Sequence, residues 1–382
     1  MTRIAFVSCN ETPWGGSEEL WARAAICLAD QGHDVFVAKP RITLAAEPIR
    51  DLRNRGVPIT DLFAIGPVPG RMINFVSFLA RPAMFAWLLL RLWAFLTRRK
   101  PDLIVLSQGG SWDGFYMERV LSRFDIPYVL ICQKASDLYW PPDSSRATIA
   151  RLVTGAAHVF TVSHHNLRLL QEQISARLDN ASVVRNPFLV DYDAPQPWPA
   201  ETDPVRIACI GRLYPMEKGQ DMLLRVLARD RWQARNIHVD FYGEGINRAG
   251  LEAMAQFLGL KNVAFHGHVE DIGEIWANHH ALVLPSRAEG LPLVLVETML
   301  SGRIAIVSIA GGSGEVLEHG VDGFVMDGYD EDSLDRAMED AWQAREDWPE
   351  IALRAAASIR KAVPASPPAD LARRIVEIAA KR

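Results

Sequence analysis

At 382 residues, the chain is longer than one hydrophobic core usually organises, so we expect two domains. Hydrophobic residues make up 49% and charged residues 23% of the sequence, which is typical of a globular protein and excludes a disordered or fibrous one. The formal net charge is −5, with a small basic excess in the first half and an acidic excess in the second. This distribution argues against nucleic-acid binding and favours an anionic acceptor or a membrane surface near the first half.

In the first half, short strand-like segments alternate with longer helical segments, which predicts a parallel sheet covered by helices. The expected strands are residues 4–9, 35–38, 103–107, 128–132 and 158–162. Residues 17–31 are expected to form a helix that ends at Gly32. The first strand begins almost at Met1, so we expect no signal peptide.

The cysteines are far apart and lie in or beside apolar segments, which predicts buried free thiols rather than disulfides or metal ligands. They are Cys9, Cys27, Cys132 and Cys209. This usage fits a reducing, cytoplasmic compartment.

Residues 72–100 contain a strongly apolar segment that Arg81, Pro82 and Arg91 interrupt and that three basic residues close. Its longest uncharged stretch is shorter than the roughly 20 apolar residues that a spanning helix needs. Two interpretations remain: a helix packed in the core, or a helix that lies on the inner face of a membrane with its arginines towards lipid phosphates.

Prolines crowd residues 187–204, which predicts a linker between two domains. The α/β pattern then restarts, with expected strands at residues 205–211, 238–242, 263–266, 281–284, 304–308 and 323–325. We therefore expect an α/β protein with two Rossmann-like domains in series, the first over residues 1–195 and the second over residues 203–365.

The segment that follows the first strand of the second domain, residues 211–219, carries Arg212 and Lys218 and leads into a helix. Ligands of such sheets bind at the carboxyl ends of the strands. Two cations beside a helix N-terminus would suit a diphosphate and the charge that develops when it leaves. A solvated basic loop would have the same composition, and this segment alone does not separate the two interpretations.

Glu289 and Glu297 are separated by seven residues and bracket a turn and the start of a helix. Pro292 suits a helix start, and backbone N–H groups from Gly290 to Leu293 would point at a ligand. Glu297 could accept hydrogen bonds from a ribose diol. Further glycine turns follow strands at Gly243 and in the segments 265–271 and 311–315, and glycine lets the backbone approach a nucleotide closely.

These motifs resemble the retaining glycosyltransferases of family 4, which have the GT-B fold. The resemblance implies that the two domains face each other across a cleft and that the terminal helix, residues 366–382, packs back on the first domain. The E-x7-E motif matches at Glu289 and Glu297, and the G-R-L…K-G loop matches from Gly211 to Gly219. The G-x-G turn at Gly243 and the F-x-G-x-V-x-D segment containing Gly267 also match, over roughly residues 205–328. In the first half the resemblance is limited to short segments such as Gly15-Gly16-Ser17-Glu18.

The resemblance implies a role for each matching residue. Arg212, Lys218 and Glu289 would be catalytic: the two cations would neutralise the departing diphosphate, and Glu289 would meet the donor sugar. Glu297 would hold the ribose, and the backbone from Gly267 to Val269 would lie against the base. The other expected donor-binding residues are Gly15, Gly16, Gln133, Gly211, Gly243, Gly290, Leu291 and Leu293.

One position departs from the family pattern. Many relatives have a histidine after the strand at residues 128–132, where this chain has Gln133. Glutamine can orient a sugar through its amide but cannot become cationic. Gln108 is the other candidate for this position.

We therefore expect a retaining glycosyltransferase that uses a UDP- or GDP-sugar and a glycan or lipid-linked acceptor, in bacterial surface polysaccharide synthesis. The alternative is a nucleotide-sugar-binding protein of the same fold that has lost turnover. We expect no cofactor and no metal, because the histidines lack the spacing of zinc or iron sites and the resemblance implies metal-independent catalysis.

Overall fold

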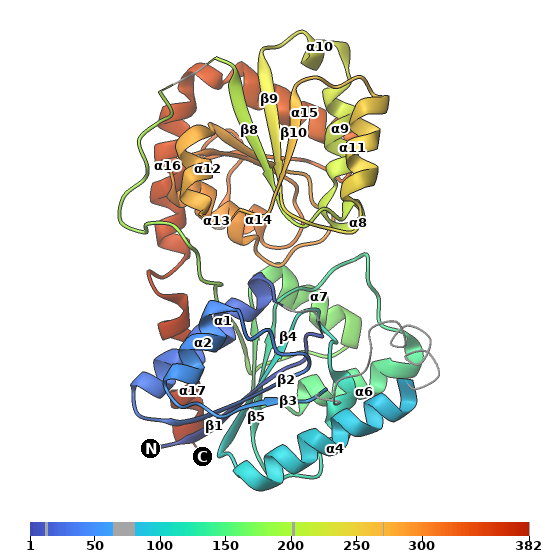
Figure 1. The fold of residues 1–382 in the computed structure, drawn as a ribbon, viewed down its shortest axis with the longest axis vertical. Helices are drawn as coiled ribbons and strands as arrows, with labels where there is room; N and C mark the ends of the chain where they lie inside the picture. Colours follow the sequence, from blue (N-terminus) through green and yellow to red (C-terminus); the bar gives the residue numbers. More distant parts are fainter. Residues whose placement is uncertain (12–13, 64–80, 201–202, 270, 382) are drawn as a thin grey trace.

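A computed structural model describes the chain except for residues 12–13, 64–80, 201–202, 270 and 382, and except for the side chains of residues 81–83. The described residues form two α/β units, one above the other in Figure 1, with the carboxyl ends of their parallel strands towards each other. This is the GT-B architecture that the sequence predicts.

The first sheet is fully parallel, with the strand order β3-β2-β1-β4-β5-β6-β7. Its strands are β1 (Arg3–Ser8), β2 (Asp34–Lys39), β3 (Ile59–Asp61), β4 (Leu103–Gln108), β5 (Tyr128–Cys132), β6 (His158–Thr161) and β7 (Ala181–Val183). The five expected strands are present. The sequence analysis missed the edge strands β3 and β7, because three half-buried residues are too few to show an alternating pattern.

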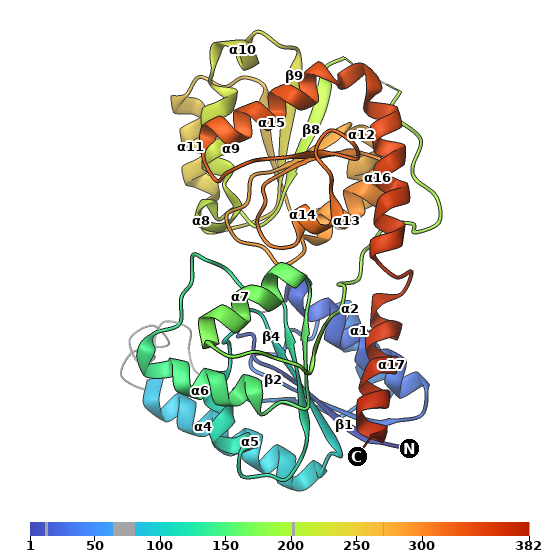
Figure 2. The same cartoon turned by 180° about the vertical axis from the view of Figure 1, so that it is seen from behind.

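Helices cover both faces of this sheet. They are α1 (Gly16–Asp30), α2 (Glu47–Asn54), α4 (Arg81–Arg99), α5 (Glu118–Leu121), α6 (Asp143–Thr154) and α7 (His164–Ile174). The last helix of the chain, α17 (Pro367–Ala380), returns from the second unit and lies beside α1 (Figures 1 and 2). Its Leu371 and Ile375 are buried in the same core cluster as Leu20 and Leu28 of α1.

The second sheet is also parallel, with the order β10-β9-β8-β11-β12-β13. Its strands are β8 (Val205–Ile210), β9 (Ile237–Tyr242), β10 (Val263–Gly267), β11 (Ala281–Leu284), β12 (Ile304–Val307) and β13 (Phe324–Val325). Its helices are α8 (Pro215–Lys218), α9 (Gln220–Leu227), α10 (Asp230–Gln233), α11 (Arg248–Phe257), α12 (Ile272–Asn278), α13 (Leu293–Leu300), α14 (Ser313–Val316), α15 (Glu331–Gln343) and α16 (Trp348–Ala362).

A buried arginine fastens the proline-rich segment to the second unit. The guanidinium of Arg303 is fully enclosed and donates hydrogen bonds to the carbonyl oxygens of Gln196 and Pro197, and to that of Trp276 at 2.7 Å. Burial lowers the pKa of Arg303 to about 10. Several carbonyl dipoles therefore solvate this cation in place of water and hold the linker in position.

Helix α4 is the described part of the apolar segment, and residues 72–80 of that prediction lie outside the described residues. Leu88, Leu92, Phe95 and Leu96 pack into the core of the first unit, as the packing-helix interpretation requires. The opposite side of the helix stays exposed at Trp87 and its neighbours. Among the described residues, no helix is long and apolar enough to cross a membrane.

The thiols are free. Cys9, Cys132 and Cys209 are buried, as the sequence predicts, whereas Cys27 is only half-buried. Burial raises the pKa of the Cys132 and Cys209 thiols to about 12.

Candidate functional site

Three predicted glycines of the second unit form a continuous backbone edge at the ends of β8, β9 and β10. The N–H of Gly243 donates to the carbonyl of Gly267 at 2.6 Å. Gly243 has a φ of 129°, and a Cβ on it would lie 2.1 Å from the carbonyl oxygen of Gly211. A side chain there would force the strand ends apart, so glycine is required for this edge to close.

Both predicted cations lie at this edge, and each is paired with a carboxylate. Lys218 Nζ is 2.5 Å from Glu289 Oε1, which also accepts a 2.7 Å hydrogen bond from the hydroxyl of Ser286. Arg212 Nη2 is 2.6 Å from Glu217 Oε2, and its side chain is 53% exposed. A diphosphate could bind Lys218 and Arg212 in place of these carboxylates, because it also presents negatively charged oxygens to the two cations.

Glu217 also joins the two units, which the sequence analysis did not anticipate. Its Oε1 accepts a 2.7 Å hydrogen bond from Lys134 Nζ, at the end of β5 in the first unit. Burial would raise the pKa of Glu217, but the hydrogen bond and charge of Lys134 and the charge of Arg212 hold it below its usual range. Lys134, Glu217 and Arg212 therefore form one charged chain across the boundary. The available sequence signal was a cation two residues after the end of β5.

Gln133 and Gln108, the two candidates for the position where many relatives have a histidine, have different environments. The amide of Gln108 is occupied: it donates to the carbonyl of Asp113 at 2.7 Å and accepts from the thiol of Cys132. Gln133 is 4% exposed, and in the described part of the chain neither its amide nitrogen nor its amide oxygen has a hydrogen-bond partner. Buried amides are rarely left open, so Gln133 has the free bonding capacity that a ligand would use.

The glycine-rich turns of both units meet at the boundary. A Cβ on Gly290 would lie 2.1 Å from the carbonyl oxygen of Gln133, and one on Gly16 would lie 2.4 Å from Cδ1 of Leu293. Gly15 precedes α1 and Leu293 begins α13, so the N-terminal ends of two helices come together here. Helix N-termini favour negative charge, and this convergence suits an anionic ligand.

The remaining predicted residues of this region pack around the turn. Leu291 is buried in a cluster that includes Val162 of the first unit, and Val269 packs against the same cluster.

Glu297 takes no part in the hydrogen bonds that link Lys134, Glu217 and Arg212. It is 4% exposed, and its Oε1 accepts a 3.0 Å hydrogen bond from the backbone N–H of Leu189 in the linker. No described cation pairs with it. Burial raises the pKa of Glu297 to about 7, although the Leu189 hydrogen bond opposes this effect. The second glutamate of the pair is therefore a buried carboxyl without a counter-charge.

Glu315, from the glycine-rich segment 311–315, has a clear structural partner. Its two carboxylate oxygens accept hydrogen bonds from the backbone N–H groups of His164 and His165, at 3.1 and 2.6 Å. These groups begin α7 of the first unit. Glu315 therefore caps a helix across the boundary and helps to fix the relative position of the two units.

Two of the histidines bind a buried aspartate. Asp240 on β9 forms hydrogen bonds with the imidazoles of His266 and His279, at 2.5 and 2.9 Å, and is 2.7 Å from the guanidinium of Arg206. Burial would raise the pKa of Asp240, but these partners hold it well below its usual range. The Asp240 carboxylate is therefore ionised, and both of its oxygens have hydrogen-bond partners within the second unit.

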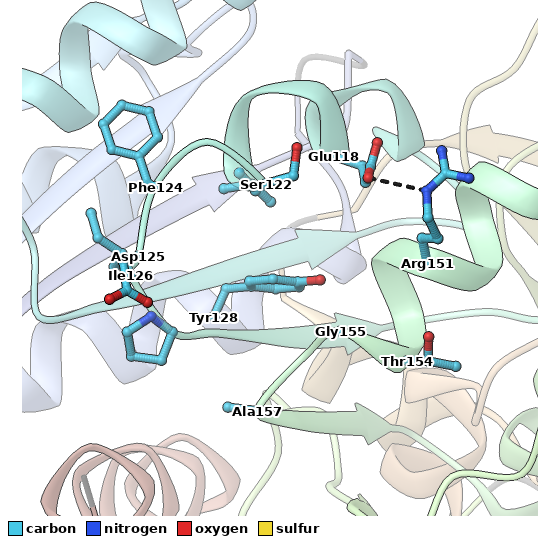
Figure 3. Close-up of a pocket in the computed structure, with 12 residues that line it drawn as sticks. Glu118, Ser122, Phe124, Asp125, Ile126, Tyr128, Arg151, Thr154, Gly155 and Ala157 are labelled. Atoms are coloured by element: carbon cyan, nitrogen blue, oxygen red, sulfur yellow. Dashed lines mark hydrogen bonds and ion pairs between the residues drawn. The ribbon is translucent and has the colours of Figure 1, made fainter.

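The hollow drawn in Figure 3 lies elsewhere. Its lining includes Tyr128, the first residue of β5, together with Arg151 and Glu118, which form a 3.3 Å ion pair. Gln133 and Lys134 follow the carboxyl end of β5, whereas Tyr128 is at its amino end. This hollow therefore lies at the opposite ends of the strands from Lys134 and its partners Glu217 and Arg212. None of the predicted site residues lines it.

Comparison with known proteins gives two family matches. Residues 15–187 match the model "Glycosyl transferase 4-like domain", and residues 204–344 match "Glycosyl transferases group 1". The boundary between them falls in the linker.

Among curated proteins, the Vi polysaccharide biosynthesis protein VipC/TviE of Salmonella typhi is 36% identical over 27% of this chain and 19% of its own length. A GDP-mannose-dependent phosphatidylinositol monomannoside mannosyltransferase of Mycolicibacterium smegmatis is 32% identical over 35% of this chain and 37% of its own length. The matched segments therefore cover well under half of the length of each of these two relatives.

Among solved structures, Anabaena HepE in complex with UDP superimposes with a TM-score of 0.76 at 19% identity. The superposition covers 98% of this chain and 99% of HepE.

Proposed function

This chain belongs to the GT-B glycosyltransferases, and on that premise we propose that it transfers a sugar from a nucleoside-diphosphate sugar to a glycan or lipid-linked acceptor. The observation that carries the proposal is the meeting of charges at the boundary of the two domains. Lys218 with Glu289, and Arg212 with Glu217 and Lys134, lie where the carboxyl ends of both sheets face each other. Helix N-termini and Gln133 approach the same boundary.

In this proposal, the pyrophosphate of the donor displaces the carboxylates from Lys218 and Arg212. Both cations then lie beside the bridging oxygen that becomes negative as the sugar departs. Fixed cations at a developing charge stabilise the transition state more than the ground state, which is the condition for catalysis. Glu289, released from Lys218, accepts hydrogen bonds from the hydroxyls of the donor sugar, and Gln133 uses its open amide for the same purpose.

The ribose and the base would lie further along the second domain. Glu297 would accept hydrogen bonds from the ribose diol, and the backbone from Gly267 to Val269 would lie against the base. The UDP complex of HepE supports a nucleotide in this fold, and we propose a UDP- or GDP-sugar as the donor.

We propose that transfer retains the configuration of the sugar, with the acceptor hydroxyl attacking from the side that the diphosphate leaves. This route needs no side-chain nucleophile. One relative named above is a polysaccharide biosynthesis protein and the other is a phosphatidylinositol monomannoside mannosyltransferase, which supports a role in bacterial surface polysaccharide synthesis. For such a role we propose a location on the cytoplasmic side of the membrane.

A thermal-shift panel of UDP-, GDP-, ADP- and dTDP-sugars tests the donor assignment, because a cognate donor raises Tm by mass action. The identified donor is then incubated with glycan and lipid-linked acceptors, and the anomeric configuration of the product is read by NMR. A product of inverted configuration would contradict retention, and no shift with any nucleotide would contradict the donor site.

The second candidate is a nucleotide-sugar-binding protein without turnover, and the replacement of the usual histidine by Gln133 favours it. Strong binding of one donor, without transfer or hydrolysis across varied acceptors, would support this candidate.

A further inference from the structure

Helix α4 has an apolar face that the rest of the described protein leaves uncovered. Its core-facing side is filled by Leu88, Leu92, Phe95 and Leu96. On the other side, Trp87, Leu90 and Trp93 are 41%, 54% and 46% exposed. These three follow one another at intervals of three residues, so they lie in one row along the helix. Isolated exposed apolar residues are ordinary, but a row of large ones marks a contact surface.

The charges on this helix are all positive. The sequence of α4 contains four arginines and no acidic residue, and Lys100 follows it. Within the described structure, Arg91, Arg98, Arg99 and Lys100 take part in no ion pair. Arginines on other exposed helices do: Arg373 on α17 pairs with two carboxylates of its own helix. No described carboxylate thus neutralises these basic groups.

We propose that α4 docks the protein on an anionic phospholipid surface, with the helix axis parallel to the membrane. Trp87, Leu90 and Trp93 enter the boundary between headgroups and acyl chains, where indole rings are favoured. Arg91 lies beside this row, with its guanidinium 5.8 Å from the Trp87 ring centre. The exposed Arg98 and Lys100 bind lipid phosphates.

Charge decides between a membrane and a second copy of this chain as the partner. Two copies packed through α4 would bring like charges together with no acidic residue on the helix to balance them, whereas a bilayer rich in anionic lipid supplies the opposite charge. Figures 1 and 2 both place α4 on the side of the first domain that faces away from the second. Docking would therefore leave the boundary between the domains free.

The proposal goes beyond glycosyl transfer and is tested without a donor. The full chain is sedimented with vesicles of phosphatidylcholine alone and with vesicles half composed of phosphatidylglycerol. We expect the wild type to bind the anionic vesicles at least about tenfold more strongly, and added salt to weaken this binding. The triple variant Trp87→Ser/Leu90→Ser/Trp93→Ser should bind them at least about tenfold less.

A matched control removes exposed apolar side chains elsewhere. Phe257 and Leu353 are 88% and 59% exposed, and Phe257→Ser/Leu353→Ser should bind vesicles as the wild type does. A second variant, Arg98→Gln/Lys100→Gln, should lose part of the preference for anionic lipid while keeping the apolar row. Far-UV circular dichroism and the nucleotide-induced shift in Tm are measured on every variant, so that a misfolded protein or a failed donor site is distinguished from lost docking.

Failure of the wild type to bind anionic vesicles would overturn the proposal, as would undiminished binding by the folded triple variant. Equal binding to both vesicle types would overturn the role of the cations. If light scattering instead shows a dimer that the triple variant dissociates, α4 is an interface between two copies and the membrane assignment is wrong.

Discussion

Replacing Glu297 by glutamine should make the ligand-free protein more stable at alkaline pH. The pKa of this buried carboxyl is raised from its ordinary value near 4.5 to about 7. Between these two values the folded state keeps a proton that the unfolded chain releases, so stability is lost as the pH rises. With about 1.4 kcal/mol per pKa unit, the loss between pH 5 and pH 8 is about 2.5 kcal/mol.

Glu297→Gln removes this dependence and keeps an amide oxygen for the N–H of Leu189. Relative to the wild type, its free energy of unfolding should therefore rise by about 2 to 3 kcal/mol from pH 5 to pH 8. Urea denaturation at pH 5, 6, 7 and 8 measures this difference, with Glu350→Gln on the exposed side of α16 as the control. Parallel pH profiles for the wild type and Glu297→Gln would refute the reasoning.

The same group should couple donor binding to pH, because a ribose diol donates hydrogen bonds best to the ionised carboxylate. Calorimetric titration of the cognate nucleoside diphosphate should show affinity that rises in the wild type as the pH passes through about 7. For Glu297→Gln the affinity should be weaker and flat. A pH-dependent affinity in the variant would assign the proton to another group.

Further predictions concern other residues of the site and the sheet behind it. Lys218→Ala should lower kcat on the order of 10²- to 10³-fold in a donor-turnover assay, because it removes a charge aimed at the leaving group; near-normal turnover would contradict this role. Lys134→Ala should raise the donor KM several-fold and broaden the domain arrangement seen by small-angle scattering, and Lys134→Arg should restore both; if Lys134→Ala leaves both measurements unchanged, the cross-domain bridge has no function. Asp240→Asn should lower the free energy of unfolding at pH 7 by roughly 2 kcal/mol. The difference in free energy of unfolding between the wild type and Asp240→Asn should narrow below about pH 4, because the ionised Asp240 then stabilises the wild type less. Urea denaturation at pH 7 and pH 3 measures this difference, and the same value at both pH values would contradict the prediction. Gly290→Ala should abolish turnover while the fold persists by circular dichroism, since its Cβ would clash with a carbonyl oxygen of the first domain 2.1 Å away; an active variant would show that the domains do not need this contact.

Much of the fold follows from local sequence patterns. Buried strands such as β4 and β11 are short apolar segments bounded by turn residues, and the proline-rich linker separates two such series. The edge strands β3 and β7 were missed because three-residue strands gain their structure from pairing with a neighbour rather than from their own pattern.

The candidate site was predictable where one segment carries several groups, as in the loop from Gly211 to Gly219. The hydrogen bonds between the two domains could not be predicted from the sequence. Nothing in the sequence near Lys134 indicates that Glu217 is its partner, and Glu315 gives no local sign that it caps α7. Such contacts depend on how the two sheets face each other, which no single segment encodes.

The exposed row on α4 shows a similar limit. Its apolar composition was evident, but only the fold reveals that one side is buried and the other open. The buried side agrees with the packing-helix interpretation, and the exposed side is the surface that the membrane proposal concerns.

We infer that the cations at the domain boundary, released from their carboxylates, stabilise a nucleoside diphosphate as it leaves a sugar donor. The most direct test measures the release of nucleoside diphosphate from each sugar donor of the panel in the presence of candidate acceptors. We predict acceptor-dependent release from one donor and a near-complete loss of that release in Arg212→Ala. Release that persists in this folded variant would show that Arg212 does not stabilise the leaving diphosphate, and a donor that binds tightly but is never consumed would show that the protein is not a transferase.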